Sequence, residues 1–284
     1  MEYKLGAHVS AAGGLSKALG RAAEIGCNCA QVFSTSPRGW NEAKFSSSEV
    51  KEFVKEKKQR GIEPVYFHAS YLINLADSGK TGHLSKKVLT AELNIASELG
   101  VRGSVIHLGS FKKSSVAEVE GGLWDVLIGN IGEVVRKMPR YVLFIIENAG
   151  NRKIGQSLDE ISRIIKEVNS PNIRVCLDTC HLFSAGYNIS IVRELENFLD
   201  EFDDKIGLEK LEVVHINDSR DPFASFRDRH ENIGEGTLGR ETFKMVLNHP
   251  KLKHLPFILE VPGFEGEGPD KKNLDILKLL CGEQ

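Results

Sequence analysis

The stretch Val65-Tyr66-Phe67-His68 is a short apolar run of β-prone residues that ends on one ionisable side chain. The same pattern recurs five more times, and a longer amphipathic segment follows most of these runs. Apolar runs that alternate with amphipathic segments indicate parallel strands joined by helices. The other five runs are Ser104-Val105-Ile106-His107, Phe144-Ile145-Ile146-Glu147, Val175-Cys176-Leu177-Asp178, Val213-Val214-His215 and Phe257-Ile258-Leu259-Glu260.

Two further apolar runs bring the predicted strands to eight, at residues 4–9, 29–34, 64–69, 103–109, 142–149, 173–179, 211–218 and 256–262. Helices are predicted at residues 15–25, 49–60, 84–99, 116–137, 158–168, 191–202, 240–247 and 271–280, and Gly26, Gly61 and Gly100 are placed to end three of them. Eight such pairs in 284 residues favour a single-domain (β/α)8 TIM barrel over residues 1–284. An open doubly wound sheet is the alternative, although its G-x-G-x-x-G motif is missing after the first strand.

The six polar residues at the strand ends are expected to converge, because parallel barrel strands present their carboxyl ends to one mouth. Three carboxylates and three imidazoles in one cavity would repel and lose hydration unless cations compensate. Mixed histidine and carboxylate ligation favours zinc, with manganese or iron as alternatives. Three more candidates follow strands six and seven, and the full set of nine candidate ligands is His68, His107, Glu147, Asp178, His181, His215, Asp228, His230 and Glu260. Nine ligands suffice for two or three ions, and paired metal ions are suited to phosphoryl transfer.

Composition narrows the classes of protein that remain. The formal charge of -2 argues against a globally basic nucleic-acid binder, although it leaves room for a local basic surface. No apolar stretch approaches the roughly 18 residues of a membrane span, and the first residues lack the apolar core of a secretory signal. Five cysteines, an odd number, fit no disulfide framework. We therefore expect a cytoplasmic protein without membrane contact. Cys27, Cys29, Cys176 and Cys180 are expected to be buried, and His83, His249 and His254 to face solvent.

Several motifs occur in one order along nearly the whole chain: residues 6–14 (GAHVSAAGG), 70–75 (SYLINL), 176–181 (CLDTCH), 185–187 (AGY), 215–219 (HINDS) and 228–236 (DRHENIGEG). In these motifs the sequence resembles the endonuclease IV family of apurinic/apyrimidinic (AP) DNA-repair endonucleases. The resemblance implies three zinc ions. His68, His107 and Glu147 would hold the first; Glu147, Asp178, His215 and Glu260 would hold the second; and His181, Asp228 and His230 would hold the third.

The resemblance also implies the reaction. A hydroxide activated between the first two metals would attack the phosphate 5′ of an abasic site in duplex DNA, with Glu147 and Glu260 as catalytic residues. The ends left would be a 3′-hydroxyl and a 5′-deoxyribose phosphate, as base excision repair requires. Three divalent cations would change the formal charge from -2 to +4, so the acidic balance does not oppose DNA binding.

Lesion recognition in the family works by bending the duplex and flipping the abasic nucleotide, a step that costs least where a base is missing. Arg38, Tyr71 and Leu72 occupy the matching loop positions, and Arg229 lies in a mouth loop, where we expect it to contact a phosphate. Tyr71 and Leu72 are equally compatible with a buried core. The chain departs from the family pattern at Leu108 (usually proline), at Ala69 (commonly aspartate) and in the loop over residues 148–156, which puts rate, lesion range and DNA affinity in question more than metal binding.

Two other functions fit parts of the pattern. A sugar isomerase or epimerase on the same barrel also uses strand-end His, Asp and Glu for one or two divalent ions, but it has no use for the third group of ligands. A damaged-DNA binding protein without turnover is the second alternative. Analysis of bound metal discriminates the first, and incubation with a duplex that carries an abasic analogue discriminates the second. We expect the chain to be a monomer.

Overall fold

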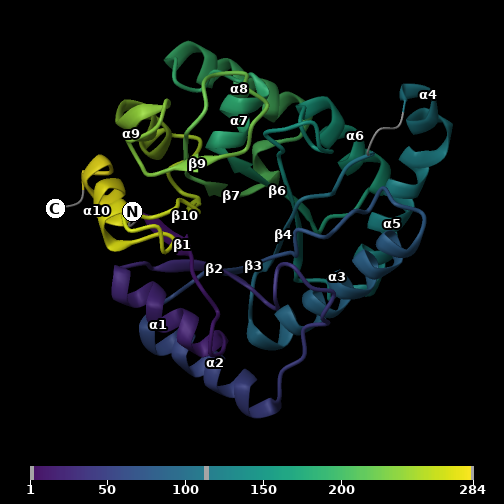
Figure 1. Cartoon of the computed structure of the whole chain (residues 1–284), viewed down its shortest axis with the longest axis horizontal. Coiled ribbons are helices and arrows are strands. Elements are labelled where there is room, and N and C mark those ends of the chain that lie inside the picture. Colours follow the sequence, from purple (N-terminus) through teal and green to yellow (C-terminus); the bar gives the residue numbers. More distant parts are fainter. Residues whose placement is uncertain (1–2, 112–114, 283–284) are drawn as a thin grey trace.

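The computed structural model, described here over residues 3–111 and 115–282, is a closed barrel of eight parallel strands surrounded by helices (Figure 1). Around the barrel the strands follow the order β1-β10-β7-β6-β5-β4-β3-β2. The predicted TIM barrel is therefore confirmed. The strands are β1 (Lys4–His8), β2 (Cys29–Phe33), β3 (Val65–His68), β4 (Gly103–Ile106), β5 (Leu143–Glu147), β6 (Ile173–Asp178), β7 (Leu211–His215) and β10 (Pro256–Leu259).

Capping residues set the ends of several outer helices. The Ser46 side chain accepts a hydrogen bond from the Glu49 amide, and the Glu49 side chain accepts one from the Ser46 amide, so α2 starts earlier than predicted. Gly26, Gly61 and Gly100 each adopt a left-handed conformation at a helix end, as predicted. The outer helices are α1 (Leu15–Ile25), α2 (Ser47–Arg60), α3 (Lys80–Leu99), α5 (Trp124–Lys137), α6 (Leu158–Val168), α8 (Val192–Lys205), α9 (Gly239–Asn248) and α10 (Lys271–Leu280).

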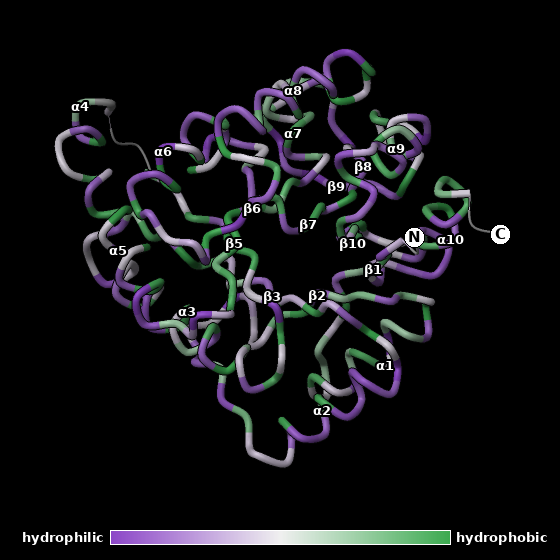
Figure 2. The backbone as a smooth tube through the Cα atoms, turned by 180° about the vertical axis from the view of Figure 1, so that it is seen from behind, coloured by the Kyte–Doolittle hydropathy of each residue, from purple (hydrophilic) through white to green (hydrophobic). Residues whose placement is uncertain are grey.

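Apolar side chains fill two separate regions. A large core lies between the strands and the helices, whose turns alternate between hydrophobic and hydrophilic residues in Figure 2. A smaller core fills the barrel interior with Cys29, Tyr66, Val105, Leu143, Ile145, Cys176, Val213 and Ile258. Side chains alternate sides along a strand, so the residue two positions further on faces the same interior, one layer nearer the mouth. This alternation determines where the side chains of the candidate site lie.

Three features differ from the prediction. The helix predicted over residues 116–137 is interrupted: α4 (Val116–Glu118) leads into a π-helical segment, η1 (Val119–Leu123), before α5, because Gly122 has a φ of 143° that no continuous α-helix accommodates. A short helix, α7 (Thr179–Ala185), follows β6 directly, and the strands β8 (Asp218–Ser219) and β9 (His230–Glu231) pair in a small antiparallel sheet. The last two additions border the mouth.

His249 differs from the prediction as well. It is buried, with its Nε2 2.9 Å from Glu196 Oε1, because the turn after α9 folds back onto α8. His83 and His254 are exposed as expected. Over the parts of the chain that the structure describes, no helix combines the length and apolar character needed to cross a bilayer.

Candidate metal centre

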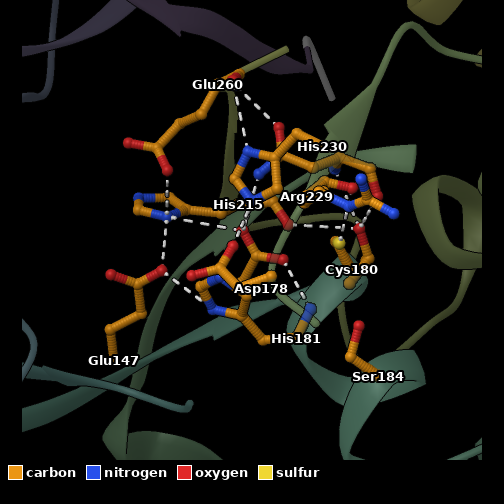
Figure 3. Close-up of polar contacts among 12 residues, drawn as sticks. Glu147, Asp178, Cys180, His181, Ser184, His215, Arg229, His230 and Glu260 are labelled. Carbon is orange, nitrogen blue, oxygen red and sulfur yellow. Dashed lines mark hydrogen bonds and ion pairs between the residues drawn. The ribbon is translucent and has the colours of Figure 1, made fainter. Parts of the chain in front are cut away.

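Glu147, at the end of β5, lies at the centre of the mouth and is fully buried. Its Oε2 is 3.3 Å from His68 Nε2 and 3.2 Å from His107 Nε2. Its Oε1 is 3.2 Å from His215 Nδ1 and 3.3 Å from His181 Nδ1. One carboxylate therefore meets four imidazoles from four different parts of the chain, and Figure 3 shows several of these side chains pointing toward one another.

Candidate ligand atoms gather in three groups, within each of which they lie no more than 4.8 Å apart. The groups are His68, His107 and Glu147; Glu147, Asp178, His215 and Glu260; and Asp178, His181 and His230. Asp228 adjoins the third group, with its Oδ1 2.9 Å from His181 Nε2 and 3.5 Å from His230 Nε2. The structure thus brings all nine candidates together, and it places Asp178 between the second and third groups.

The third group depends on elements that form around the mouth. Asp178 ends β6 and caps α7, because its Oδ1 accepts a hydrogen bond from the His181 amide at 2.9 Å. This cap fixes the first turn of α7, so that His181 faces back into the mouth. His230 begins β9, whose pairing with β8 holds the returning loop against the barrel. The helix cap thereby places the His181 imidazole at the mouth, and the short strand pair places that of His230.

One ring nitrogen of each of three candidate histidine ligands lies against a backbone carbonyl. His68 Nδ1 lies 2.8 Å from the Ala69 carbonyl, His181 Nδ1 lies 2.9 Å from that of Asn148, and His230 Nδ1 lies 3.2 Å from that of Glu260. A metal-binding histidine characteristically donates its other N–H in this way, which sets the tautomer and the ring orientation. The contact at Ala69 comes from the backbone, so the missing aspartate side chain leaves this support for His68 intact.

Burial and neighbouring charges shift the pKa values of the residues in the cluster. Burial alone would raise the pKa of the Glu147 carboxyl, but the charges of His107 and His215, together with hydrogen bonds from His181 and His215, hold that pKa well below its usual range. Burial disfavours the imidazolium of His181, yet Asp178 and Asp228 raise its pKa well above the ordinary value. Burial dominates at His107 and lowers its pKa to about 4. Protonated histidines here balance the negative charge of the carboxylates, and divalent cations would do the same.

The donor set fits divalent metal ions. His230 Nε2 is buried and forms no hydrogen bond within the described residues, although it lies 3.6 Å from Asp178 Oδ2 and 3.5 Å from Asp228 Oδ1. Buried polar atoms are usually satisfied, so a ring nitrogen that faces two carboxylates without a hydrogen bond fits a metal ligand. Imidazole and carboxylate together suit zinc, and also manganese or iron.

Three polar residues at the site were not identified as site residues from the sequence. His8, at the end of β1, places its Nδ1 2.9 Å from Glu260 Oε1. Gln31, fully buried on β2, donates from Nε2 to the same oxygen at 2.6 Å. Asn217 donates to Asp178 Oδ2 at 2.6 Å and accepts from the Glu260 amide at 2.7 Å. The alternation of sides along β1 and β2 was the available signal, since His8 and Gln31 pair in register.

The residues expected to contact DNA lie around the mouth. Arg38 is exposed, Leu72 is half-buried, and Tyr71 is 59% exposed, so Tyr71 is not a core residue. The Tyr71 ring packs 5.4 Å from that of Phe33 and 5.6 Å from that of His68. Its amide donates to the Pro37 carbonyl at 3.1 Å, which ties its loop to that of Arg38. Arg229 is half-exposed and forms a two-pronged ion pair with Asp221.

Comparisons with known proteins agree with this fold. The xylose isomerase-like TIM barrel family model matches residues 19–280. A probable endonuclease 4 from Persephonella marina is 38% identical over 283 residues, which cover 98% of this chain and 96% of that protein. The crystal structure of endonuclease IV from Thermus thermophilus superposes with a TM-score of 0.86 at 31% identity, covering 99% of this chain and 100% of that one. A D-tagatose 3-epimerase-like protein, at 20% identity and a TM-score of 0.73 over 98% of this chain and 97% of its own, shares the fold. The chain belongs to the endonuclease IV family, on the xylose isomerase-like TIM barrel.

Proposed function

We propose that this member of the endonuclease IV family, and thus a phosphodiester hydrolase, is a zinc-dependent AP endonuclease. It would cleave the phosphodiester bond 5′ to an abasic site in duplex DNA and leave a 3′-hydroxyl and a 5′-deoxyribose phosphate. The observation that carries the proposal is the third ligand group, Asp178, His181 and His230 with Asp228 beside it, within reach of the two groups that share Glu147. A sugar isomerase or epimerase uses one or two ions and has no need of this group.

The assignment of ligands follows the geometry. His68, His107 and Glu147 would hold one ion; Glu147, Asp178, His215 and Glu260 a second; and His181, His230 and Asp228 a third, with Asp178 close to both of the last two. Divalent cations held there would act as Lewis acids. They would lower the pKa of a bound water molecule toward neutrality and neutralise charge on a phosphate. Glu147 reaches the first two groups and Glu260 closes the second, so these two carboxylates are the proposed catalytic residues.

Side chains outside the cluster would select the lesion. The Tyr71 ring packs against the ring of His68 at the edge of the mouth. An aromatic ring there can stack on a base or fill the gap left by a missing base. Arg38 and Leu72 lie on the two loops joined beside it, and they are suited to a backbone phosphate and to an apolar wedge. Arg229 is proposed as a phosphate contact, although Asp221 already binds part of its guanidinium.

The proposed setting is one catalytic barrel over residues 1–284 that acts as a monomer in the cytoplasm. Cysteines 27, 29, 176, 180 and 281 are all free thiols, which suits a reducing compartment.

A nicking assay tests the function. Purified protein loaded with zinc is incubated with a duplex that carries one abasic analogue, with the undamaged duplex as control. Cleavage 5′ of the lesion and extension of the product by a polymerase, which requires a 3′-hydroxyl, are expected. Metal analysis should give about three zinc ions per chain. Tight binding without nicking by the fully loaded protein would favour the non-catalytic alternative, and a single manganese or cobalt ion would favour the isomerase.

A further inference from the structure

The His215 ring differs from those of His68, His181 and His230 in what contacts its second ring nitrogen. Its Nδ1 faces the cluster, 3.2 Å from Glu147 Oε1 and 3.3 Å from Glu260 Oε2. Its Nε2 lies 2.9 Å from the side-chain oxygen of Gln31. At His68, His181 and His230 a backbone carbonyl occupies the corresponding place. The orientation of His215 therefore depends on a side chain, which a substitution can remove.

The other end of the Gln31 amide contacts a second candidate ligand of the same group. Gln31 Nε2 donates to Glu260 Oε1 at 2.6 Å, and the ring of His8 lies beside both, with its Nδ1 3.0 Å from Gln31 Nε2 and 2.9 Å from Glu260 Oε1. A carboxylate can only accept, so the amide nitrogen must face Glu260 and the amide oxygen must face His215. The His215 nitrogen at that oxygen must then carry the proton, which leaves the Nδ1 lone pair free to face the cluster.

Burial makes this arrangement consequential. Gln31 is fully buried, and two residues earlier on the same strand and side Cys29 contributes to the apolar layer inside the barrel. An apolar side chain at position 31 would fill that space without the cost of desolvating an amide. The Cys176 thiol also lies beside His215, but a thiol is a weak hydrogen-bond partner compared with an amide.

We propose that Gln31 is the positioning residue of the second metal group: its amide selects the His215 tautomer that ligates through Nδ1, and it holds Glu260 in place for the same ion. The inference rests on the proposed function for the identity of that group. It adds a residue that contacts two ligands of one ion and contributes no ligand atom.

Metal affinity and the histidine tautomer test this role without any measurement of nicking. Gln31→Met fills a similar volume but neither donates nor accepts. Gln31→Glu keeps an acceptor for His215 but sets a second carboxylate against Glu260. Cys29→Ala, a change in the apolar layer of the same strand, is the matched control. Zinc affinity is measured by competition with a chelator of known affinity, and circular dichroism checks that each chain folds.

We expect Gln31→Met to lose about 10- to 100-fold in affinity for one of the bound zinc ions, the usual effect of removing support from a ligand. Cys29→Ala should change thermal stability but keep the wild-type affinity. In the zinc-loaded wild type labelled with 15N-histidine, the ring proton of His215 should be on Nε2 and protected from solvent, a signal assigned by its absence in His215→Gln. Gln31→Glu should keep that signal, and Gln31→Met should lose it.

Two results would overturn the inference. One is a wild-type His215 that carries its proton on Nδ1, which can be observed even where no variant folds. The other is a Gln31→Met chain with wild-type affinity and an unchanged signal. A wild-type chain that takes up no divalent metal would instead contradict the proposed function itself, so the two failures are distinguishable.

Discussion

The Glu147 side chain supplies both of its oxygens to the cluster, so its charge and its geometry can be separated by Glu147→Gln. The substitution keeps the shape but removes one charge and turns one oxygen into a donor that faces imidazoles. We expect nicking of an abasic duplex to fall by more than about 100-fold, since loss of mere support for a ligand already costs about 10- to 100-fold. Single-turnover cleavage measures it. Glu92→Gln, a buried carboxylate outside the mouth, is the control. Near-normal cleavage by the Glu147 variant would contradict the assignment.

Tyr71 combines exposure with a rigid position, because its ring packs on Phe33 and His68. Tyr71→Ala should weaken binding of a duplex with an abasic analogue by roughly 5- to 150-fold, the range for loss of one stacking contact. Zinc content should stay unchanged, because Tyr71 supplies no atom to the three groups. Fluorescence anisotropy measures the affinity. Tyr141→Ala removes another exposed tyrosine, just before β5 at the opposite end of the barrel, and should bind like wild type. Equal affinities for the two variants would argue against a role for Tyr71 in recognition.

Between α3 and the barrel, Glu92 links an outer helix to two strands. Its buried carboxyl accepts hydrogen bonds from Ser34, next to β2, and from Ser104 on β4 at 2.5 Å. Burial raises the pKa of Glu92 above its usual value. The folded chain therefore holds this proton more tightly than the unfolded chain does. The resulting stabilisation is complete below the unfolded pKa of about 4.3, and it is lost as the pH rises through the folded pKa.

Glu92→Gln should abolish that part of the pH dependence. The amide cannot ionise, and it can still contact both serine hydroxyls. Relative to wild type, the free energy of unfolding of the variant should improve as the pH rises from about 4 toward neutrality. Urea denaturation with a chelator present measures it without interference from bound metal. A difference between the two chains that is independent of pH would mean that Glu92 does not titrate in this range.

Helices and strands with one apolar side could be predicted from the sequence, and elements without such a side could not. The caps at Gly26, Gly61 and Gly100 follow from the backbone that only glycine adopts readily. By contrast, residues 179–184 of α7 are all buried, so no periodicity of three to four residues marks the helix. The break near Gly122 was open to prediction from Gly121-Gly122, but the apolar pattern on both sides masked it.

The sequence pointed to the candidate ligands for a related reason. Most of them follow an apolar strand and are of a type that binds metals, so position and chemistry gave the same answer. Gln31 lies inside β2 rather than at its end, and its uncharged amide rarely ligates metals, so it met neither criterion. Its role appears only when β1 and β2 pair and set it opposite His8. Which carboxylate approaches which imidazole also depends on the closed barrel, as the place of Asp178 beside His230 illustrates.

At the scale of the whole molecule, the proposed metal ions would join segments that are far apart in the sequence. The three ligand groups draw on β3, β5, β6 and β7, on α7 and β9, and on the residues after β4 and β10. The unfolded chain lacks this geometry, so metal binding at these groups would add directly to the stability of the fold. It also screens the carboxylates and imidazoles that crowd the mouth.

Removal of metal should therefore lower the melting temperature. At a free metal concentration about 100 times the dissociation constant, each site adds about 2.7 kcal/mol. For a chain of 284 residues that corresponds to roughly 5 °C per site. Calorimetry of the protein after chelation, and again after zinc is restored, measures the shift. His181→Asn combined with His230→Asn should lose the share of the third group, whereas His83→Ala, an exposed histidine on α3, should keep the full shift. If zinc stabilised the wild type and the double variant equally, the third group would not bind metal, and the feature that separates this chain from a one- or two-metal isomerase would be lost.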